Sequence, residues 1–103
     1  MYSTDIVISA VQIALARRGY EYPRRGERGK NTTVARIMAA DALHYFSRAS
    51  NSGAATAVNC STASGKSLRL RASSEQWGRD DRDLWIAEVR AIIDSIVQKS
   101  TQQ

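Results

Sequence analysis

The sequence predicts a single α+β domain that is mainly helical, with two helices, a β-hairpin and a long C-terminal helix in that order. Three observations support this fold: apolar residues at helical spacing over 5–18 and 34–50, an alternating pattern over 58–72, and a broad apolar stripe over 74–98. With 103 residues, of which 43% are hydrophobic and 24% charged, the chain fits one globular domain, residues 1–103.

The first helix is expected to begin after a capping residue at positions 3–5 and to end before Gly19. Its polar arc holds only Asp5, Ser9, Gln12 and Ala16. Because almost the whole circumference is apolar, we expect this helix to be buried on nearly all sides. The β-branched residues 6–8 leave a strand as the alternative at its start.

A long basic loop is expected over residues 19–32, which hold the only proline and three of the six glycines. A loop of about 14 residues is longer than most connections in a compact domain and is usually functional or disordered. From Arg17 to Lys30 there are six basic and two acidic residues, a net charge of +4 out of the chain's +5. The basic character of the chain is therefore local.

A second helix is expected from Val34 to about Ser50. One of residues 31–33 caps its start, and the polar run 51–53 is expected to end it. Its apolar stripe is Val34, Met38, Ala42, Tyr45 and Ala49, and the opposite side carries Arg36, Asp41, His44, Ser47 and Arg48.

The expected β-hairpin pairs the apolar positions Val58 and Cys60 with Leu70 and Leu68. Residues 63–65 suit a three-residue turn with a glycine at its last position. In this register Arg69 and Arg71 point away from the apolar face. A two-stranded hairpin is marginal alone, so its apolar face is expected to lie on the helices.

The stretch from about Ser74 to about Gln98 is expected to form an amphipathic helix with a broad apolar face. Its central seam, at a spacing of four, three and four residues, is Trp85, Val89, Ile92 and Ile96, flanked by Ile86, Ile93 and Val97. The aspartates at 80, 81 and 83 suit a helix start after Gly78. Residues 99–103 are expected to be a frayed tail.

The residue inventory argues against an enzyme and against a metal site. One histidine, His44, and one cysteine, Cys60, cannot form a Cys/His zinc cage. The expected positions of these two residues, on an outer helix face and an inner hairpin face, also argue against a catalytic pair. The segment 26–30 lacks the first glycine and the final Ser or Thr of a phosphate-binding loop. We therefore expect no catalytic residue, metal, cofactor or small-molecule substrate.

The expected location is the cytoplasm, without membrane contact. No apolar run approaches the roughly 18–20 residues that span a bilayer. The N-terminal sequence lacks the basic segment and uninterrupted apolar segment of a signal peptide. The single cysteine excludes an internal disulfide, which is compatible with a reducing compartment.

The first functional hypothesis is a small regulatory protein that binds, and inhibits or scaffolds, another protein through an apolar helix face with an arginine-rich rim. Three helices and a hairpin cannot easily cover so much apolar surface, so we expect a homodimer or another protein partner. Burial of the first helix at the centre of a monomer is the alternative. The expected interface residues are Trp77, Trp85, Ile86, Val89, Ile93 and Val97, because aromatic and apolar anchors dominate interface energies.

The alternative hypothesis is a nucleic-acid-binding regulator. Arginine contacts phosphate, and Tyr20 and Tyr22 among the arginines can stack on unpaired bases. The expected contacts are Arg17, Arg18, Arg24, Arg25, Arg28 and Lys30, helped by Arg69 and Arg71. The same pattern of basic residues is also explained by a charged loop that is only solvated, or by a loop that docks on an acidic protein surface. The excess of arginine over lysine, 12 to 3, is also explained by arginine-biased codons.

Overall fold

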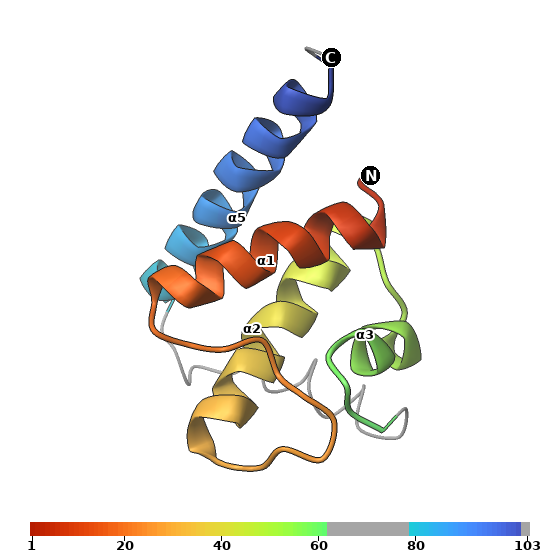
Figure 1. Ribbon diagram of the computed structural model, residues 1–103, viewed down its shortest axis with the longest axis vertical. Helices are drawn as coiled ribbons and strands as arrows, with labels where there is room; N and C mark the ends of the chain where they lie inside the picture. The colour runs from red at the N-terminus through yellow and green to blue at the C-terminus, as the bar shows by residue number, and fades with distance from the viewer. Residues whose placement is uncertain (62–78, 102–103) are drawn as a thin grey trace.

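In the computed structural model, which describes residues 1–61 and 79–101, every regular element is a helix: α1 (Thr4–Arg17), α2 (Lys30–Ser47), α3 (Asn51–Ala57) and α5 (Arg79–Thr101). α1 lies across α2 and the first half of α5, and α3 packs against α2 (Figure 1). The C-terminal end of α5 extends beyond the other helices (Figure 1). None of the described helices is long and apolar enough to cross a bilayer.

The α+β fold class expected from the sequence is wrong for the described residues, whose regular elements are all helices and which contain no strand. Val58 and Cys60 follow directly on α3: Val58 caps its C-terminal end, and the Cys60 N–H donates to the carbonyl of Ala55 at 2.8 Å. The alanine-rich sequence of α3 favours a helix, and two alternating positions are too short a pattern to indicate a strand. The turn and second strand expected over 63–72 lie outside the described residues.

α1 is capped by Ser3, whose Oγ accepts a hydrogen bond from the backbone N–H of Ile6 at 3.4 Å. It ends before Gly19, whose φ of 82° is a conformation that glycine adopts without steric cost. Its buried residues are Val7, Ala10, Val11, Ala14 and Leu15. Because Ile13 is 42% exposed, α1 is buried on one broad face and not on nearly all sides as expected.

The corner between α2 and α3 differs from the expected helix end. α2 begins at Lys30, four residues earlier than expected, and is ended by Arg48 in the left-handed conformation, with a φ of 53°. Ser50 then caps α3, because its Oγ accepts a hydrogen bond from the N–H of Gly53 at 3.0 Å. The polar run 51–53, expected to end the second helix, therefore forms the first turn of α3.

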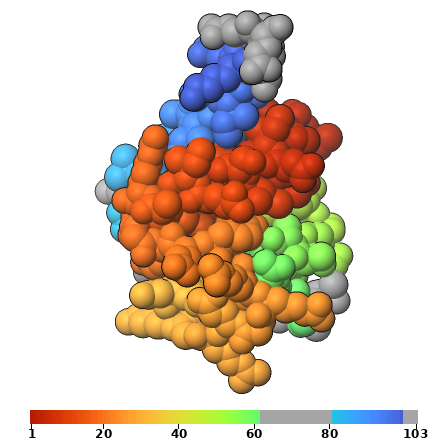
Figure 2. All heavy atoms as spheres, in the orientation of Figure 1, coloured from red at the N-terminus to blue at the C-terminus, as the bar shows by residue number. Residues whose placement is uncertain are grey.

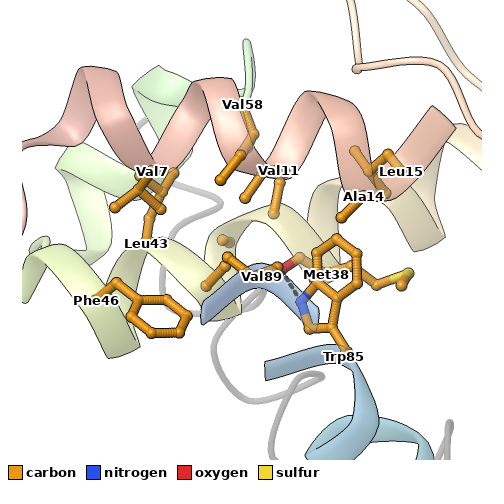
Figure 3. Close-up of a cluster of buried hydrophobic side chains, with 14 of the residues drawn as sticks. Val7, Val11, Ala14, Leu15, Met38, Leu43, Phe46, Val58, Trp85 and Val89 are labelled. Carbon is orange, nitrogen blue, oxygen red and sulfur yellow. Dashed lines mark hydrogen bonds between the residues drawn. The ribbon is translucent and has the colours of Figure 1, made fainter. Parts of the chain in front are cut away.

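The core lies where α1, α2 and α5 meet, closed by Val58 at the end of α3 (Figure 3). Its largest fully buried side chains include Trp85, Leu15, Leu43, Ile93, Val7, Val11, Val58 and Val89. The indole N–H of Trp85 donates to the carbonyl of Met38 at 3.0 Å, so the only polar atom of this ring has a partner.

The expected amphipathic C-terminal helix is confirmed over its described part. The seam positions Trp85, Val89 and Ile92 are all buried. The helix continues to Thr101, so residues 99–101 belong to α5 and not to a frayed tail. The expected start over residues 74–78 lies outside the described part of the chain.

Candidate functional site

The most distinctive polar surface is carried by the connection between α1 and α2, residues 18–29, here called the basic loop. Its interior side is anchored by two residues in succession. Pro23 is fully buried, and the half-buried Tyr22 donates its hydroxyl to the carbonyl of Ala57 at 2.6 Å. Burial raises the pKa of Tyr22 to about 12, because the ionised phenolate loses solvation. This tyrosine is therefore a structural anchor.

Arg36 on α2 fixes the rest of the loop from beneath. Its Nη1 donates to the carbonyl of Glu27 at 2.9 Å, and its Nη2 to that of Arg24 at 2.9 Å. Its Nε donates to the carbonyl of Val58 at 3.3 Å, which ties the loop to the end of α3. A planar guanidinium can serve several diverging acceptors at once, and hydrogen bonds from a charged donor are strong. The guanidinium of Arg36, on the inner side of the loop, therefore holds the loop backbone in one shape.

Asn59 adds a second fixed point. Its Nδ2 donates to the carbonyl of Pro23 at 2.9 Å, from a residue whose own φ is 59°. Asparagine tolerates this left-handed conformation better than most residues. Three consecutive residues, 57–59, thus each take part in a hydrogen bond that holds the basic loop or Arg36.

Most of the basic side chains on the loop and beside it are exposed and unpaired within the described part of the chain. Arg24, Arg25, Arg28 and Lys30 are exposed and have no side-chain hydrogen bond or ion pair among the described residues. The same is true of Arg17 at the end of α1. In the space-filling view the loop covers the surface between α1 and the start of α2 (Figure 2). These five cations form the surface called here the basic patch.

Arg18 does not belong to the basic patch, although the sequence places it in the same run. It forms an ion pair with Glu88 at 3.4 Å, and its guanidinium lies 5.4 Å from the ring centroid of Trp85. Arg18 therefore attaches the end of α1 to α5 and is already paired within the molecule.

The N-terminus of α2 lies inside the basic patch. Its N-cap is Gly29, with no side-chain capping hydrogen bond, and its first turn has no acidic residue. Thr32 donates its hydroxyl to the carboxylate of Glu27 at 3.2 Å. A pocket of about 290 Å³ at this point is lined by Gly19, Tyr20, Glu21, Glu27, Asn31 and Thr32. The start of the helix adds partial positive charge to the patch, and Glu27 offsets part of it.

The apolar interface expected on the C-terminal helix is instead part of the core. Trp85, Val89 and Ile93 are 0% exposed, Ile86 is buried, and Val97 is half-buried. In this conformation Trp85, Ile86, Val89 and Ile93 are not accessible to a second chain, whereas Val97 keeps part of its surface. Trp77, Arg69 and Arg71 lie outside the described residues.

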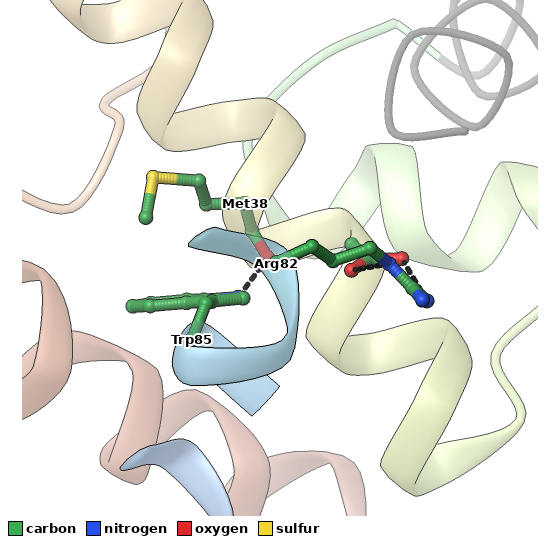
Figure 4. Close-up of polar contacts among 4 residues, drawn as sticks. Met38, Arg82 and Trp85 are labelled. Atoms are coloured by element: carbon green, nitrogen blue, oxygen red, sulfur yellow. Dashed lines mark hydrogen bonds and ion pairs between the residues drawn. The ribbon is translucent and has the colours of Figure 1, made fainter. Parts of the chain in front are cut away.

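The start of α5 is fixed by contacts that the sequence pattern does not reveal. Arg82 donates to both carboxylate oxygens of Asp41 on α2, at 3.0 and 3.1 Å, one turn from the Trp85 hydrogen bond (Figure 4). The hydrogen bond to Asp41 raises the pKa of Arg82 above its ordinary range. Asp41 is only 6% exposed, so this pairing supplies a partner for a carboxylate that is costly to bury alone.

No cluster that could bind a metal occurs within residues 1–61 and 79–101. His44 shares its Nδ1 in a hydrogen bond with the carbonyl of Ala49 at 2.8 Å, beside the end of α2. Cys60 is a free, half-buried thiol. Within the described part of the chain, neither residue belongs to a group of three or more potential metal ligands.

No protein-family model, curated protein or solved structure matches this chain. Among the described surfaces, the basic patch and its anchored loop offer the clearest indication of a binding function.

Proposed function

We propose that this chain is a small, non-enzymatic binding protein that contacts the phosphate backbone of a nucleic acid through its basic loop. One observation carries the proposal: cations that are exposed and have no partner among the described residues stand on a backbone that Arg36, Tyr22 and Asn59 hold in place. Arginine and lysine side chains are the usual partners of phosphate oxygens in such complexes.

The fixed backbone matters because binding otherwise requires the loop to be ordered. Ordering a mobile loop opposes association, whereas a loop that already has its bound shape avoids most of this cost. Each phosphate that a cation neutralises releases condensed counterions, so affinity depends steeply on salt. An anchored loop with three exposed arginines, followed directly by the exposed Lys30 at the start of α2, fits this mode of binding.

The composition of the patch favours nucleic acid over an acidic protein. Protein interfaces have an apolar centre with a polar rim, whereas nucleic-acid interfaces are polar and strongly positive throughout. Residues 24–30 contain no apolar side chain, and the neighbouring Tyr22 and Pro23 are turned toward the interior. An acidic protein surface remains the competing partner that the experiment below distinguishes.

The hypothesis of a regulatory protein acting through an apolar helix face is less well supported by the geometry. Its anchors Trp85, Val89 and Ile93 would have to leave the core before a second chain could contact them. We retain the expectation of a regulatory role in the cytoplasm, without a cofactor or small-molecule substrate. The contact with the partner macromolecule is assigned to the basic patch.

The test is a binding titration by fluorescence anisotropy with labelled 20-base-pair DNA and RNA at several salt concentrations. We expect log K to fall linearly with log salt, with a slope of about −0.9 for each phosphate neutralised on DNA. The double variant Arg24→Gln/Arg25→Gln should weaken binding. It should also reduce the magnitude of the slope by the amount expected for about two phosphate contacts.

The matched control is Arg48→Gln/Lys99→Gln, which removes the same charge from exposed positions at the ends of α2 and α5. It should keep the wild-type slope. Equal weakening by both double variants would assign binding to net charge and not to the loop. Absence of binding to DNA and RNA at low salt, together with binding to an acidic protein surface such as a polyglutamate-rich peptide, would overturn the proposal.

A further inference from the structure

We infer that the pocket at the start of α2 receives one unpaired base of the bound nucleic acid, while the basic patch holds the neighbouring phosphates. The inference rests on the proposed function and names the feature of the nucleic acid that this chain recognises. The pocket has a volume of about 290 Å³ and is lined by Gly19, Tyr20, Glu21, Glu27, Asn31 and Thr32. This volume is close to the lower end of the roughly 300–1,000 Å³ found for small-ligand pockets, so it suits a single ring system.

The charges in and beside the pocket favour a ligand whose anionic and neutral parts are separate. Two of the lining residues are glutamates, and Glu27 is followed in the chain by the exposed cations Arg28 and Lys30. The carboxylates repel a phosphate from the pocket itself, whereas the cations beside it repel a positively charged ligand. A nucleotide meets both conditions, because its negative charge lies on the phosphate and its base is uncharged.

The polar side chains of the pocket select the edge of the base. Thr32 donates to one carboxylate oxygen of Glu27, Oε1, at 3.2 Å. An ionised carboxylate only accepts hydrogen bonds and has about four acceptor positions, so most of this capacity remains for donors on a ligand. The amino groups of adenine, cytosine and guanine are such donors, whereas thymine and uracil present a carbonyl oxygen where adenine and cytosine carry the amino group. We therefore expect the pocket to prefer a base with an amino group.

Tyr20 adds an aromatic residue to the wall of the pocket. It is half-buried and packs against the core, and its backbone N–H donates to the carbonyl of Leu15 at 2.9 Å. Aromatic side chains bind unpaired bases by stacking, and recognition of such bases combines stacking with hydrogen bonds to the base edge. The pocket contains both kinds of residue.

Glu27 is held from two sides before any ligand binds. Nη1 of Arg36 donates to its backbone carbonyl at 2.9 Å, and the hydroxyl of Thr32 donates to its carboxylate. An acceptor that is already fixed avoids much of the cost of ordering it on binding. Because Arg36 also donates to the carbonyl of Arg24, the same side chain fixes the base-binding carboxylate relative to the phosphate-binding loop.

The experiment uses the full chain and one labelled 20-base-pair DNA duplex at about 100 mM salt. The duplex is either fully paired or carries a single bulged dA, dC, dT or abasic nucleotide. We expect a bulged dA or dC to bind about tenfold more tightly than the abasic bulge or the paired duplex, which offer phosphates but no free base. A bulged dT should bind at least about fivefold more weakly than dA or dC.

Two variants test the pocket separately from the basic patch. Glu27→Gln should abolish the preference for dA and dC over dT, because a neutral amide donates as well as accepts. Tyr20→Leu, which keeps an apolar side chain against the core, should reduce the preference for bulged dA over the paired duplex about tenfold. The control Asp94→Asn removes one negative charge from an exposed position on α5 and should keep every preference.

The outcomes separate this inference from the proposed function. Equal affinity for the bulged, abasic and paired duplexes would show that the pocket inference is wrong, while the proposed function stands. A preference for bulged dA that persists in both Glu27→Gln and Tyr20→Leu would also overturn the inference, because the base would then be bound elsewhere. If none of the duplexes binds even at low salt, the proposed function itself fails.

Discussion

Arg36 serves the basic loop although it lies outside it. Its side chain donates to carbonyls at Arg24, Glu27 and Val58, so its positive charge is used within the molecule while those of the loop face outward. A lysine at this position would keep the charge, but a single ammonium cannot reach the same three diverging acceptors as a planar guanidinium. The geometry of the side chain is therefore as important as its charge.

We expect Arg36→Lys to lower the free energy of unfolding by about 1–3 kcal/mol, because loop carbonyls lose their charged donors. It should also weaken nucleic-acid binding and flatten its salt dependence, since the cations of the loop lose their fixed spacing. Urea denaturation and anisotropy titrations measure the two effects. The control Arg48→Lys, at an exposed position without a described partner, should leave both unchanged. Wild-type salt dependence in Arg36→Lys would contradict this role.

Tyr22 gives the loop a dependence on high pH. Its pKa is raised from 10.0 to about 12 by burial, so between these values the unfolded chain loses the phenolic proton while the folded chain keeps it. The unfolded state then binds fewer protons, and stability falls as pH rises through this range. Below pH 10 the contribution is constant.

We expect Tyr22→Phe to be less stable than wild type by about 1 kcal/mol at pH 8, through loss of the hydrogen bond to Ala57. The difference should shrink as pH rises from about 10 to 12, because only the wild type carries the ionisable group. Urea denaturation of both proteins across this range is the measurement. A difference that is the same at every pH would mean that Tyr22 ionises equally in the folded and unfolded chains.

At the scale of the helices, the first half of α5 is attached to α1 and α2 by three polar contacts. Arg82 pairs with Asp41, Trp85 donates to Met38, and Glu88 accepts from Arg18. The spacing of apolar residues predicts the buried face of this helix because that face follows from a period of 3.6 residues. It does not predict the polar partners, which are 41 to 70 residues distant and are set by how the helices cross.

We expect a double-mutant cycle of Asp41→Asn and Arg82→Gln to give a coupling free energy of about 1–2 kcal/mol. The carboxylate is buried but the arginine side chain is 39% exposed, so solvent screening keeps the value below that of a fully buried pair. Thermal or urea denaturation of the four proteins provides the cycle. Asp94→Asn, at an exposed position of α5, is the control and should change stability by less than about 0.5 kcal/mol. A coupling near zero would mean that the pair is not formed in solution.

The elements that the sequence did not predict are those that depend on short or distant signals. α3 begins with a polar run, residues 51–53, that resembles a helix end, and it forms because Ser50 provides a new cap. The alternating pattern that predicted a strand has only two apolar positions here, Val58 and Cys60. Val58 is buried because α3 places it against the core. The position of the basic loop was predictable from its glycines and proline. Its fixed shape was not, since it depends on Arg36 and Asn59.

At the scale of the whole molecule, the burial of the α5 face bears on self-association. A dimer formed through this face would require side chains that the chain already uses for its own core, such as Ile93. We therefore expect the single chain to be stable without a second copy on this face. For a chain whose folding does not require a partner, the midpoint of thermal unfolding is independent of protein concentration.

We expect the melting temperature to remain constant over about a hundredfold range of protein concentration. Ile93→Ala should lower the free energy of unfolding by about 2–5 kcal/mol, whereas Ile13→Ala, at a 42% exposed position, should cost much less. Calorimetry at several concentrations and urea denaturation of both variants provide the measurements. A melting temperature that rises with concentration, and loses this dependence in Ile93→Ala, would instead indicate a dimer through α5.

The hydrogen bonds of residues 57–59 have a consequence for how this surface can change over evolution. The charge of the basic patch is set by Arg17, Arg24, Arg25, Arg28 and Lys30. The shape of its loop is set by Arg36 and by the turn that follows α3. Substitutions in one set leave the other intact. The strength of attraction to a polyanion and the geometry of the contact can thus be selected separately, by mutations at different places in the chain.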